Sequence, residues 1–161
     1  MSITTTTHLN FRGGEARAAL DFYAAAFGGE VTAVTYAEFG MPAELPDAQR
    51  VVFGQVVSPE GFRVMAYDVP GAGEQGASRQ GSSAQGASPT AASTRRENGL
   101  TVTDQPFFVA VRAASLDEAA GYWERLAEGA SVIESLAASA WSAGFGMLTD
   151  RFGVTWVLDV A

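Results

Sequence analysis

The chain has no cysteine and a single histidine, His8. Without cysteine the protein cannot form disulfides, thiolate zinc sites or a cysteine nucleophile, and this composition fits a reducing compartment. Basic residues are also few. The chain has 10 basic and 18 acidic residues, and its formal net charge is -8. No basic face stands out, and we therefore expect no binding to nucleic acid.

Long apolar runs are absent as well. No segment approaches the roughly 20 apolar residues that a membrane-spanning helix needs. Residues 1–7 have neither the basic nor the apolar region of a signal peptide. The sequence therefore predicts a soluble, cytoplasmic protein with no membrane partner.

The apolar content is nevertheless sufficient for a core. Hydrophobic residues make up 47% of the 161 residues, and this length suits one domain or two small fused half-domains. In residues 1–70 the pattern predicts a strand, a helix and three further strands. The predicted elements are the strands Thr4–Arg12, Glu30–Phe39, Arg50–Val57 and Phe62–Val69 and the helix Glu15–Phe27.

Residues 71–104 differ in kind from both flanks. Gly, Ala, Ser, Gln and Thr dominate the segment, and apolar anchors are almost absent. Such a composition buries too little surface to offset the entropy that is lost when the chain is ordered. We interpret the segment as a flexible linker, with a lid over a binding site as the alternative.

Residues 105–161 repeat the first pattern. Ser115 and Glu118 carry the signature of a capping box at the start of a second helix. The predicted elements are the strands Phe107–Arg112, Ala130–Leu136, Gly146–Thr149 and Val154–Val160 and the helix Leu116–Glu128. The sequence thus predicts an α+β fold of two βαβββ modules, 1–70 and 105–161, joined by the linker 71–104.

The two halves can also be aligned residue by residue. The matches are Phe11-Arg12 with Val111-Arg112, Phe22-Tyr23 with Tyr122-Trp123, and Gly29 with Gly129. Because each module covers only one face of its sheet with a helix, two modules are expected to form a curved mixed sheet around a cleft, with the helices outside. A ligand would bind in that cleft.

Motifs at both ends resemble those of a known family. The opening His8-Leu9-Asn10-Phe11-Arg12-Gly13-Gly14 and the closing Asp150-Arg151-Phe152-Gly153 are similar to motifs of the vicinal oxygen chelate superfamily of glyoxalases, bleomycin-resistance proteins and dioxygenases. Within it the chain is most similar to the PhnB-like group, often labelled 3-demethylubiquinone-9 3-methyltransferase domains. The resemblance implies a pair of βαβββ modules, a homodimer and a small-molecule ligand. The label implies no methyltransferase activity, because no glycine-rich nucleotide loop follows the first strand.

The resemblance also implies a divalent metal that takes one ligand from each of four strands. The four positions fall on His8, on Met65, near residues 106–108 and on Val157. Histidine alone suits such a cation, since methionine is a soft ligand and valine, proline and phenylalanine offer no side-chain donor. No cofactor is therefore predicted, and a divalent metal is disfavoured.

His8 has two interpretations. It is an imidazole on the cleft wall without a chemical task, or it is a catalytic proton donor or acceptor for a bound ligand, because imidazole titrates near neutral pH. Period-two alternation along the strands selects further ligand-binding candidates. They are Asn10, Arg63, Met65, Tyr67, Val157 and Asp159. Arg63 would contact an anionic ligand or pair with Asp159, and the ion pair is favoured because buried charges need partners.

Large side chains in the loops complete the set of candidates. Phe39, Met41, Trp141 and Phe145 fall in loops at the strand ends. They either close over a flat ligand or pack in a dimer interface.

Three functions remain open at this point. The first is a metal-independent small-molecule binding protein of the sequestering type found among bleomycin-resistance proteins, and its acidic charge would suit a cationic ligand. The second is a lyase- or transferase-type enzyme that uses His8 with Asn10, Tyr67 or Asp159 in acid–base chemistry, or retains His8 as a remnant metal ligand. The third is a regulatory domain with a vestigial cleft.

Overall fold

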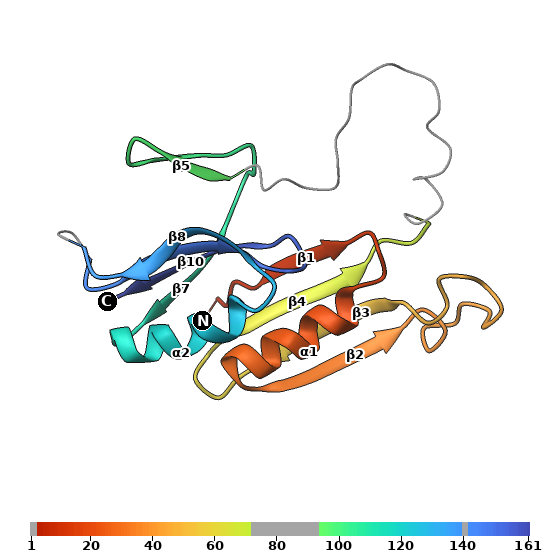
Figure 1. Cartoon of the computed structure of the whole chain (residues 1–161). Helices are drawn as coiled ribbons and strands as arrows, with labels where there is room; N and C mark the ends of the chain where they lie inside the picture. Colours follow the sequence, from red (N-terminus) through yellow and green to blue (C-terminus); the bar gives the residue numbers. More distant parts are fainter. Residues whose placement is uncertain (1–2, 72–93, 140–141) are drawn as a thin grey trace, which may run out of the picture. The chain divides into compact units, whose positions relative to one another are not determined.

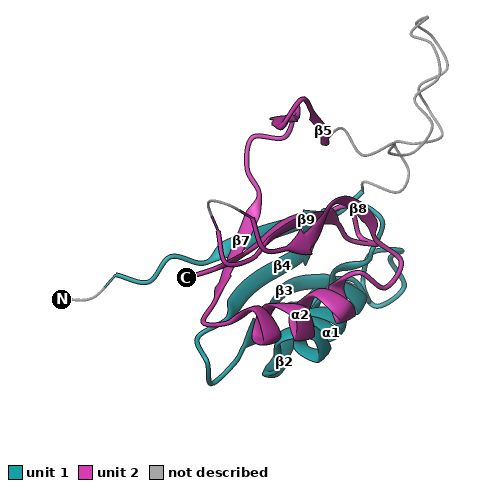
Figure 2. Ribbon diagram, turned by 60° about the vertical axis from the view of Figure 1, so that its left-hand side comes forward, with its two compact units in different colours: residues 1–84 teal, residues 85–161 magenta. Residues whose placement is uncertain are grey.

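The computed structural model describes residues 3–71, 94–139 and 142–161 of the chain. The chain divides after residue 84 into two compact units, coloured teal and magenta in Figure 2. We call the described part of the first unit module 1 and that of the second unit module 2. Most of the expected linker, residues 72–93, lies outside the described part of the chain.

Module 1 is a four-stranded sheet with one helix on one face (Figure 1). Its elements are β1 (Thr7–Phe11), α1 (Ala16–Phe27), β2 (Glu30–Thr35), β3 (Val51–Val57) and β4 (Arg63–Asp68). The strand order is β1-β4-β3-β2, with β1 parallel to β4 and the other neighbours antiparallel. The helix is amphipathic and alanine-rich, and Leu20 and Tyr23 on its apolar face are 0% exposed.

A buried carboxylate fixes the start of α1. Glu15, the N-cap residue, makes no side-chain capping hydrogen bond. Instead Asp68 at the end of β4 is 1% exposed and accepts hydrogen bonds from the backbone N–H groups of Ala16 and Val51, both at 2.9 Å. Two backbone donors at element ends are satisfied in this way, and α1, β3 and β4 are tied together at one point.

Module 2 repeats this arrangement and adds a hairpin before it. Its elements are β5 (Arg95–Glu97), β6 (Leu100–Val102), β7 (Val109–Ala113), α2 (Leu116–Leu126), β8 (Ser131–Ala137), β9 (Phe145–Thr149) and β10 (Thr155–Val160). The order β7-β10-β9-β8, with β7 parallel to β10, matches module 1 element for element.

The capping box predicted for α2 is confirmed. The Glu118 N–H donates to the Ser115 hydroxyl oxygen at 3.2 Å. The Glu118 carboxylate reaches back and accepts from the Ala114 N–H at 2.8 Å. The helix therefore begins with a local device, in contrast to the long-range carboxylate of module 1.

Two glycines mark the points where the helices approach the sheets. Gly54 of β3 and Gly146 of β9 pair with equivalent positions of β4 and β10. A methyl group on Gly54 would overlap the Leu20 side chain of α1, and one on Gly146 would lie 2.7 Å from the Trp123 ring of α2. Each strand therefore carries glycine where a large helix side chain meets its backbone.

The strand registers correct one part of the predicted repeat. His8 of β1 pairs with Met65 of β4, and Ala110 of β7 pairs with Val157 of β10. The counterpart of His8 is therefore Ala110, and the position predicted near residues 106–108 is wrong. The cause is the connection from the first strand to the helix, which is shorter after β7 than after β1.

Residues 94–103 form a hairpin at the point where the composition predicts a linker. Strands β5 and β6 pair antiparallel around Asn98 and Gly99, whose φ angles of 50° and 77° are those of a tight two-residue turn. The linker interpretation therefore does not hold for this hairpin. The lid alternative for the remaining residues stays a prediction.

The predicted α+β fold of two βαβββ modules is confirmed. In each module one helix covers one face of a mixed sheet, as expected. Among the described residues no helix has both the length and the apolar character to cross a membrane. The cleft expected between the modules stays a prediction.

Candidate functional site

We call the sheet face opposite the helix the inner face of each module. In β1, Leu9 and Phe11 are 4% and 5% exposed, whereas His8 and Asn10 between them are exposed. Successive side chains of a strand point to opposite faces, so His8 and Asn10 lie on the inner face as predicted.

Strand pairing assembles the candidates of module 1 into two rows. His8, Met65 and Gln55 are cross-strand neighbours on β1, β4 and β3. Asn10 and Tyr67 form the adjacent row. Four predicted residues therefore come together on the inner face, and Gln55, which the sequence pattern did not single out, joins them.

His8 is held by its two neighbours on this face. Its Nδ1 lies 3.2 Å from Asn10 Oδ1, and its ring meets the Tyr67 ring edge-on, with the centroids 5.4 Å apart. An amide oxygen only accepts, so the contact is a hydrogen bond in the tautomer that carries the proton on Nδ1, and in that tautomer Nε2 is an acceptor. His8 can therefore accept a hydrogen bond or a proton from a ligand.

Tyr36 is a polar residue just past the end of β2, and alternation along the strands does not select it as a site residue. Its hydroxyl donates to the Asp68 carbonyl oxygen at 2.8 Å. Partial burial raises the pKa of the Tyr36 hydroxyl, and the nearby Tyr67 and Asp68 raise it further. The phenol therefore remains protonated and keeps its hydrogen bond throughout the neutral range.

An open hollow of about 560 Å³ extends the inner face of module 1 toward β2. Gln55 and Val57 of β3 and their partners Thr32 and Glu30 of β2 line it. Arg63, another predicted residue, pairs with Val57 and is exposed at the start of β4. Polar side chains and the Arg63 guanidinium group therefore lie beside the row that contains His8.

Phe39 and Met41 lie in the turns after β2. Phe39 is 77% exposed, and Met41 is half-buried, with its N–H donating to the Tyr36 carbonyl oxygen at 2.8 Å. The exposed Phe39 ring suits either predicted role, contact with a flat ligand or with a dimer partner.

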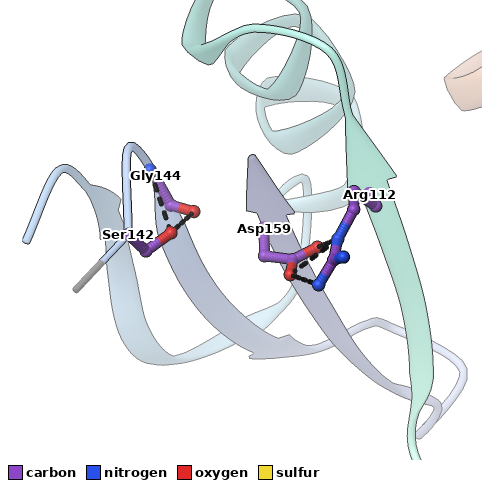
Figure 3. Close-up of polar contacts among 4 residues, drawn as sticks. All are labelled: Arg112, Ser142, Gly144 and Asp159. Carbon is purple, nitrogen blue, oxygen red and sulfur yellow. Dashed lines mark hydrogen bonds and ion pairs between the residues drawn. The ribbon is translucent and has the colours of Figure 1, made fainter. Parts of the chain in front are cut away.

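In module 2, Asp159 forms an ion pair with Arg112. Arg112 Nη2 donates to Asp159 Oδ2 at 2.7 Å (Figure 3), and the hydrogen bonds and charge of Asp159 raise the pKa of the guanidinium. The register of β7 and β10 places Arg112 directly beside Asp159. The predicted pair of Arg63 with Asp159, which would join the two modules, stays a prediction.

Ser142 and Gly144 form a hydrogen-bonded turn directly before β9. The Ser142 hydroxyl donates to the Gly144 carbonyl oxygen at 2.7 Å and accepts from the Gly144 N–H at 3.2 Å (Figure 3). This turn leads to Phe145, which is the first residue of β9 rather than a loop residue as predicted. Trp141, predicted in the same loop, lies outside the described residues.

The hairpin β5–β6 brings further residues to the inner face of module 2. Arg96 forms an ion pair with Glu134 of β8, and its guanidinium carbon lies 5.9 Å from the centre of the Phe145 ring. The Thr101 hydroxyl contacts the Met147 sulfur of β9 at 3.8 Å. The predicted Val157 is the cross-strand neighbour of Met147. The sequence pattern selected Phe145 and Val157 but missed the side chains that surround them.

The residues at the positions where the resemblance implies metal ligands include few metal donors. His8 has Met65 and Gln55 beside it, and Val157 has Ala110. One imidazole beside a thioether and an amide is a poor donor set for a divalent cation, and valine and alanine have no donor. Over residues 3–71, 94–139 and 142–161, no group of three His, Cys, Asp or Glu side chains could hold a metal ion.

Comparisons with known proteins extend these observations. The family model of the Glyoxalase/Bleomycin resistance protein/Dioxygenase superfamily matches residues 5–158. A search of curated proteins finds no match.

Several solved structures are similar to the chain. Protein PA1353 from Pseudomonas aeruginosa is 27% identical, covering 99% of this chain and 98% of its own, with a TM-score of 0.67. A PhnB protein from Bacillus cereus is 20% identical, covering 99% and 100%, with a TM-score of 0.61. A glyoxylase/bleomycin resistance protein/dioxygenase domain from Frankia sp. EAN1pec is 12% identical, covering 100% and 98%, with a TM-score of 0.56. The last two likenesses concern the fold alone.

Proposed function

The chain belongs to the glyoxalase/bleomycin resistance protein/dioxygenase superfamily, and on this premise we propose that it is a small-molecule binding protein that works without a metal ion. Ligand binding takes place on the inner face of a module. The protein is of the sequestering type, so it holds its ligand and releases it unchanged.

One observation carries the metal-independent part of this proposal. The His8 row continues into Met65 and Gln55, and the matching row of module 2 consists of Ala110, Val157 and Met147. A divalent ion bound by His8 alone would keep most of its water ligands and gain little from the protein. The rows therefore favour direct contact between side chains and an organic ligand.

The inner face of module 1 suits a flat molecule with polar edges. Tyr67 offers an aromatic edge, Met65 an adaptable apolar surface, and His8 Nε2 a hydrogen-bond acceptor. Gln55 adds an amide that donates and accepts, and the exposed Arg63 adds a positive charge at the rim. A few polar groups on a largely apolar surface are typical of small-molecule sites.

The proposal extends to assembly and location. We expect a homodimer in the cytoplasm, with the exposed rings of Phe39 and Phe107 as candidate contacts between protomers. Sedimentation velocity of the full chain tests the dimer, and Phe39→Ser should weaken it if the ring lies in the interface.

The proposed function is tested by ligand binding in the presence of a chelator. A small-molecule library is screened by thermal shift with EDTA present, and each hit is confirmed by calorimetry. Met65→Arg and Val157→Arg place a bulky charge on the two inner faces and should abolish binding. Arg17→Ala, on the outer surface of α1 where Arg17 pairs with Asp21 at 3.1 Å, is the matched control and should bind normally. Binding that requires added metal, or that survives both inner-face variants, contradicts the proposal.

A second function is favoured by the geometry of His8. In the tautomer that donates from Nδ1 to Asn10, Nε2 is an acceptor, and this arrangement suits a general base. The alternative is an enzyme of the lyase or transferase type in which His8 removes a proton from the bound ligand.

Turnover assays on the ligands found in the screen separate the two functions. If any ligand is converted, His8→Ala should abolish conversion and weaken binding by no more than about tenfold, since one hydrogen bond contributes roughly 0.5–1.5 kcal/mol. Asn10→Ala should lower the rate less, because it only orients the imidazole. Conversion that persists unchanged in His8→Ala ends the enzymatic alternative.

A further inference from the structure

Arg96 of the hairpin contacts two elements of the sheet in module 2. It contacts Glu134 of β8 through an ion pair and the Phe145 ring of β9 through its guanidinium carbon at 5.9 Å. Within the hairpin, Arg96 Nη1 donates to the Thr101 hydroxyl at 2.8 Å. A planar cation therefore lies against a carboxylate and an aromatic ring on the inner face of module 2.

The neighbouring arginine behaves differently. Arg95 pairs with Glu97 of its own strand at 2.6 Å, and its side chain is 56% exposed. The Arg96 side chain is 25% exposed, and its ion pair joins it to another element. The contrast shows that the contact of Arg96 with the sheet is specific to its position and is not a general property of the hairpin's charges.

The two groups that receive Arg96 have the chemistry of a cation site. A carboxylate accepts hydrogen bonds from a guanidinium group in its own plane. An aromatic face attracts a cation within about 6 Å of its centroid. Glu134 and Phe145 supply these two contacts from adjacent strands, and Met147, the cross-strand partner of Glu134, supplies a polarisable thioether.

The hairpin is built as a separate piece rather than as part of the sheet. Strands β5 and β6 pair only with each other, and the order of the four-stranded sheet is complete without them. The Asn98-Gly99 turn gives the hairpin its own register. Arg96 can therefore leave the sheet without breaking any of the sheet's backbone hydrogen bonds.

We propose that Arg96 is an internal occupant of a binding site for planar organic cations, formed by Glu134 and Phe145 on the inner face of module 2. A ligand that carries a guanidinium or amidinium group takes the place of the Arg96 side chain. The inference rests on the proposed function only in assigning ligands to the inner faces. It adds the ligand class, and it makes the hairpin a competitor that the ligand must displace.

Benzamidine, a flat amidinium compound, is a suitable probe. Removal of the internal competitor should let it bind at least about tenfold more tightly to Arg96→Ala than to the unaltered chain, which corresponds to roughly 1.4 kcal/mol. Calorimetry and saturation-transfer NMR on the full chain measure the affinity. Arg95→Ala removes an equal charge from the same hairpin and should leave the affinity unchanged.

Two further variants test whether the gained affinity comes from this site. Arg96→Ala combined with Glu134→Gln should lose the gain, because the amide has no charge to pair with the probe. Arg96→Ala combined with Phe145→Leu should lose most of it. Arg96→Met, which fills a similar volume without the charge, replaces Arg96→Ala if circular dichroism shows that the smaller side chain disturbs the fold.

The outcomes are distinct from those of the ligand screen. If Arg96→Ala and Arg96→Met bind benzamidine no better than Arg95→Ala, Arg96 is only a structural clasp and the inference is wrong. If the gain survives Glu134→Gln, the probe binds elsewhere and the inference is also wrong. Neither result affects a ligand that Met65→Arg displaces, so the proposed function stands or falls separately.

Discussion

The two modules share their helix side and differ on their inner side. On the helix side, both have the same strand order, and both place a glycine where a large helix side chain meets the sheet. On the inner side, His8 of module 1 corresponds to Ala110 of module 2. Among the described residues, only module 2 carries a hairpin over this face. Helix packing needs matched volumes at fixed positions, whereas the inner face is free to take up different ligand chemistry in each copy.

The modules also differ in how their helices begin. In module 1, Asp68 reaches α1 from the last residue of β4. Its counterpart at the end of β10 is Val160, so module 2 has no carboxylate there and relies on Ser115 and Glu118. The start of α1 therefore depends on the sheet, and the start of α2 depends on its own first turn.

The largest effect that we predict comes from removing the side chain that secures the start of α1. Asp68→Ala leaves the N–H groups of Ala16 and Val51 without an acceptor in a buried place, and should destabilise the chain by about 3 kcal/mol. Ser115→Ala should cost about 1 kcal/mol, because it removes a single exposed cap. Urea unfolding of both variants measures the free energies. Equal losses would mean that the two helix starts are not secured in different ways.

The shared helix side is tested by the matched glycines. A methyl group on Gly146 would lie 2.7 Å from the Trp123 ring and 2.9 Å from the Leu136 Cα atom, so Gly146→Ala should destabilise the chain by about 2 kcal/mol through overpacking. Gly121→Ala is the control within α2, where a methyl group meets nothing within 4 Å. It should stabilise by about 0.5–1 kcal/mol, because alanine favours helix. A neutral Gly146→Ala would show that the helix is not packed closely on β9.

On the inner side of module 1, Tyr36 should make a smaller contribution to stability, and this contribution should depend on pH. Tyr36→Phe removes the hydrogen bond to Asp68 and should cost about 1 kcal/mol at neutral pH. Because the folded-state pKa is raised above the ordinary value of 10.0, the unfolded chain ionises first as the pH rises, and the stability from this group is lost through the alkaline range. The free energy of unfolding should therefore fall less steeply with increasing pH for Tyr36→Phe than for the unaltered chain. An unchanged slope would mean that Tyr36 ionises alike in both states.

Much of each module could be predicted from local patterns. Alternation in β1 placed His8 on the inner face and Leu9 on the helix side, and Ser115 with Glu118 marked the start of α2. The order of a strand, a helix and three strands in both halves followed from the same patterns. These features depend on neighbours in the sequence, or on a pattern that occurs twice.

Contacts between distant strands could not be predicted in the same way. The partner of Asp159 is Arg112 because β7 runs beside β10 in a register that no single strand encodes. The hairpin was missed because the composition of residues 71–104 as a whole outweighed Asn98-Gly99, a dipeptide that favours tight hairpins. Arg96 and Glu134 were missed with it, since their ion pair exists only when the hairpin is formed.

The central claim is that the inner faces bind ligands without a metal ion, and a metal titration of the stripped protein tests it most directly. Chelator-treated full-length chain and its His8→Ala variant are titrated with Co²⁺ and Zn²⁺ by calorimetry, with the visible spectrum of Co²⁺ as a second readout. We predict no saturable one-to-one binding and no difference between the two proteins, because Met65 and Gln55 beside His8 are poor ligands for these cations. A stoichiometric site that His8→Ala abolishes would contradict the account.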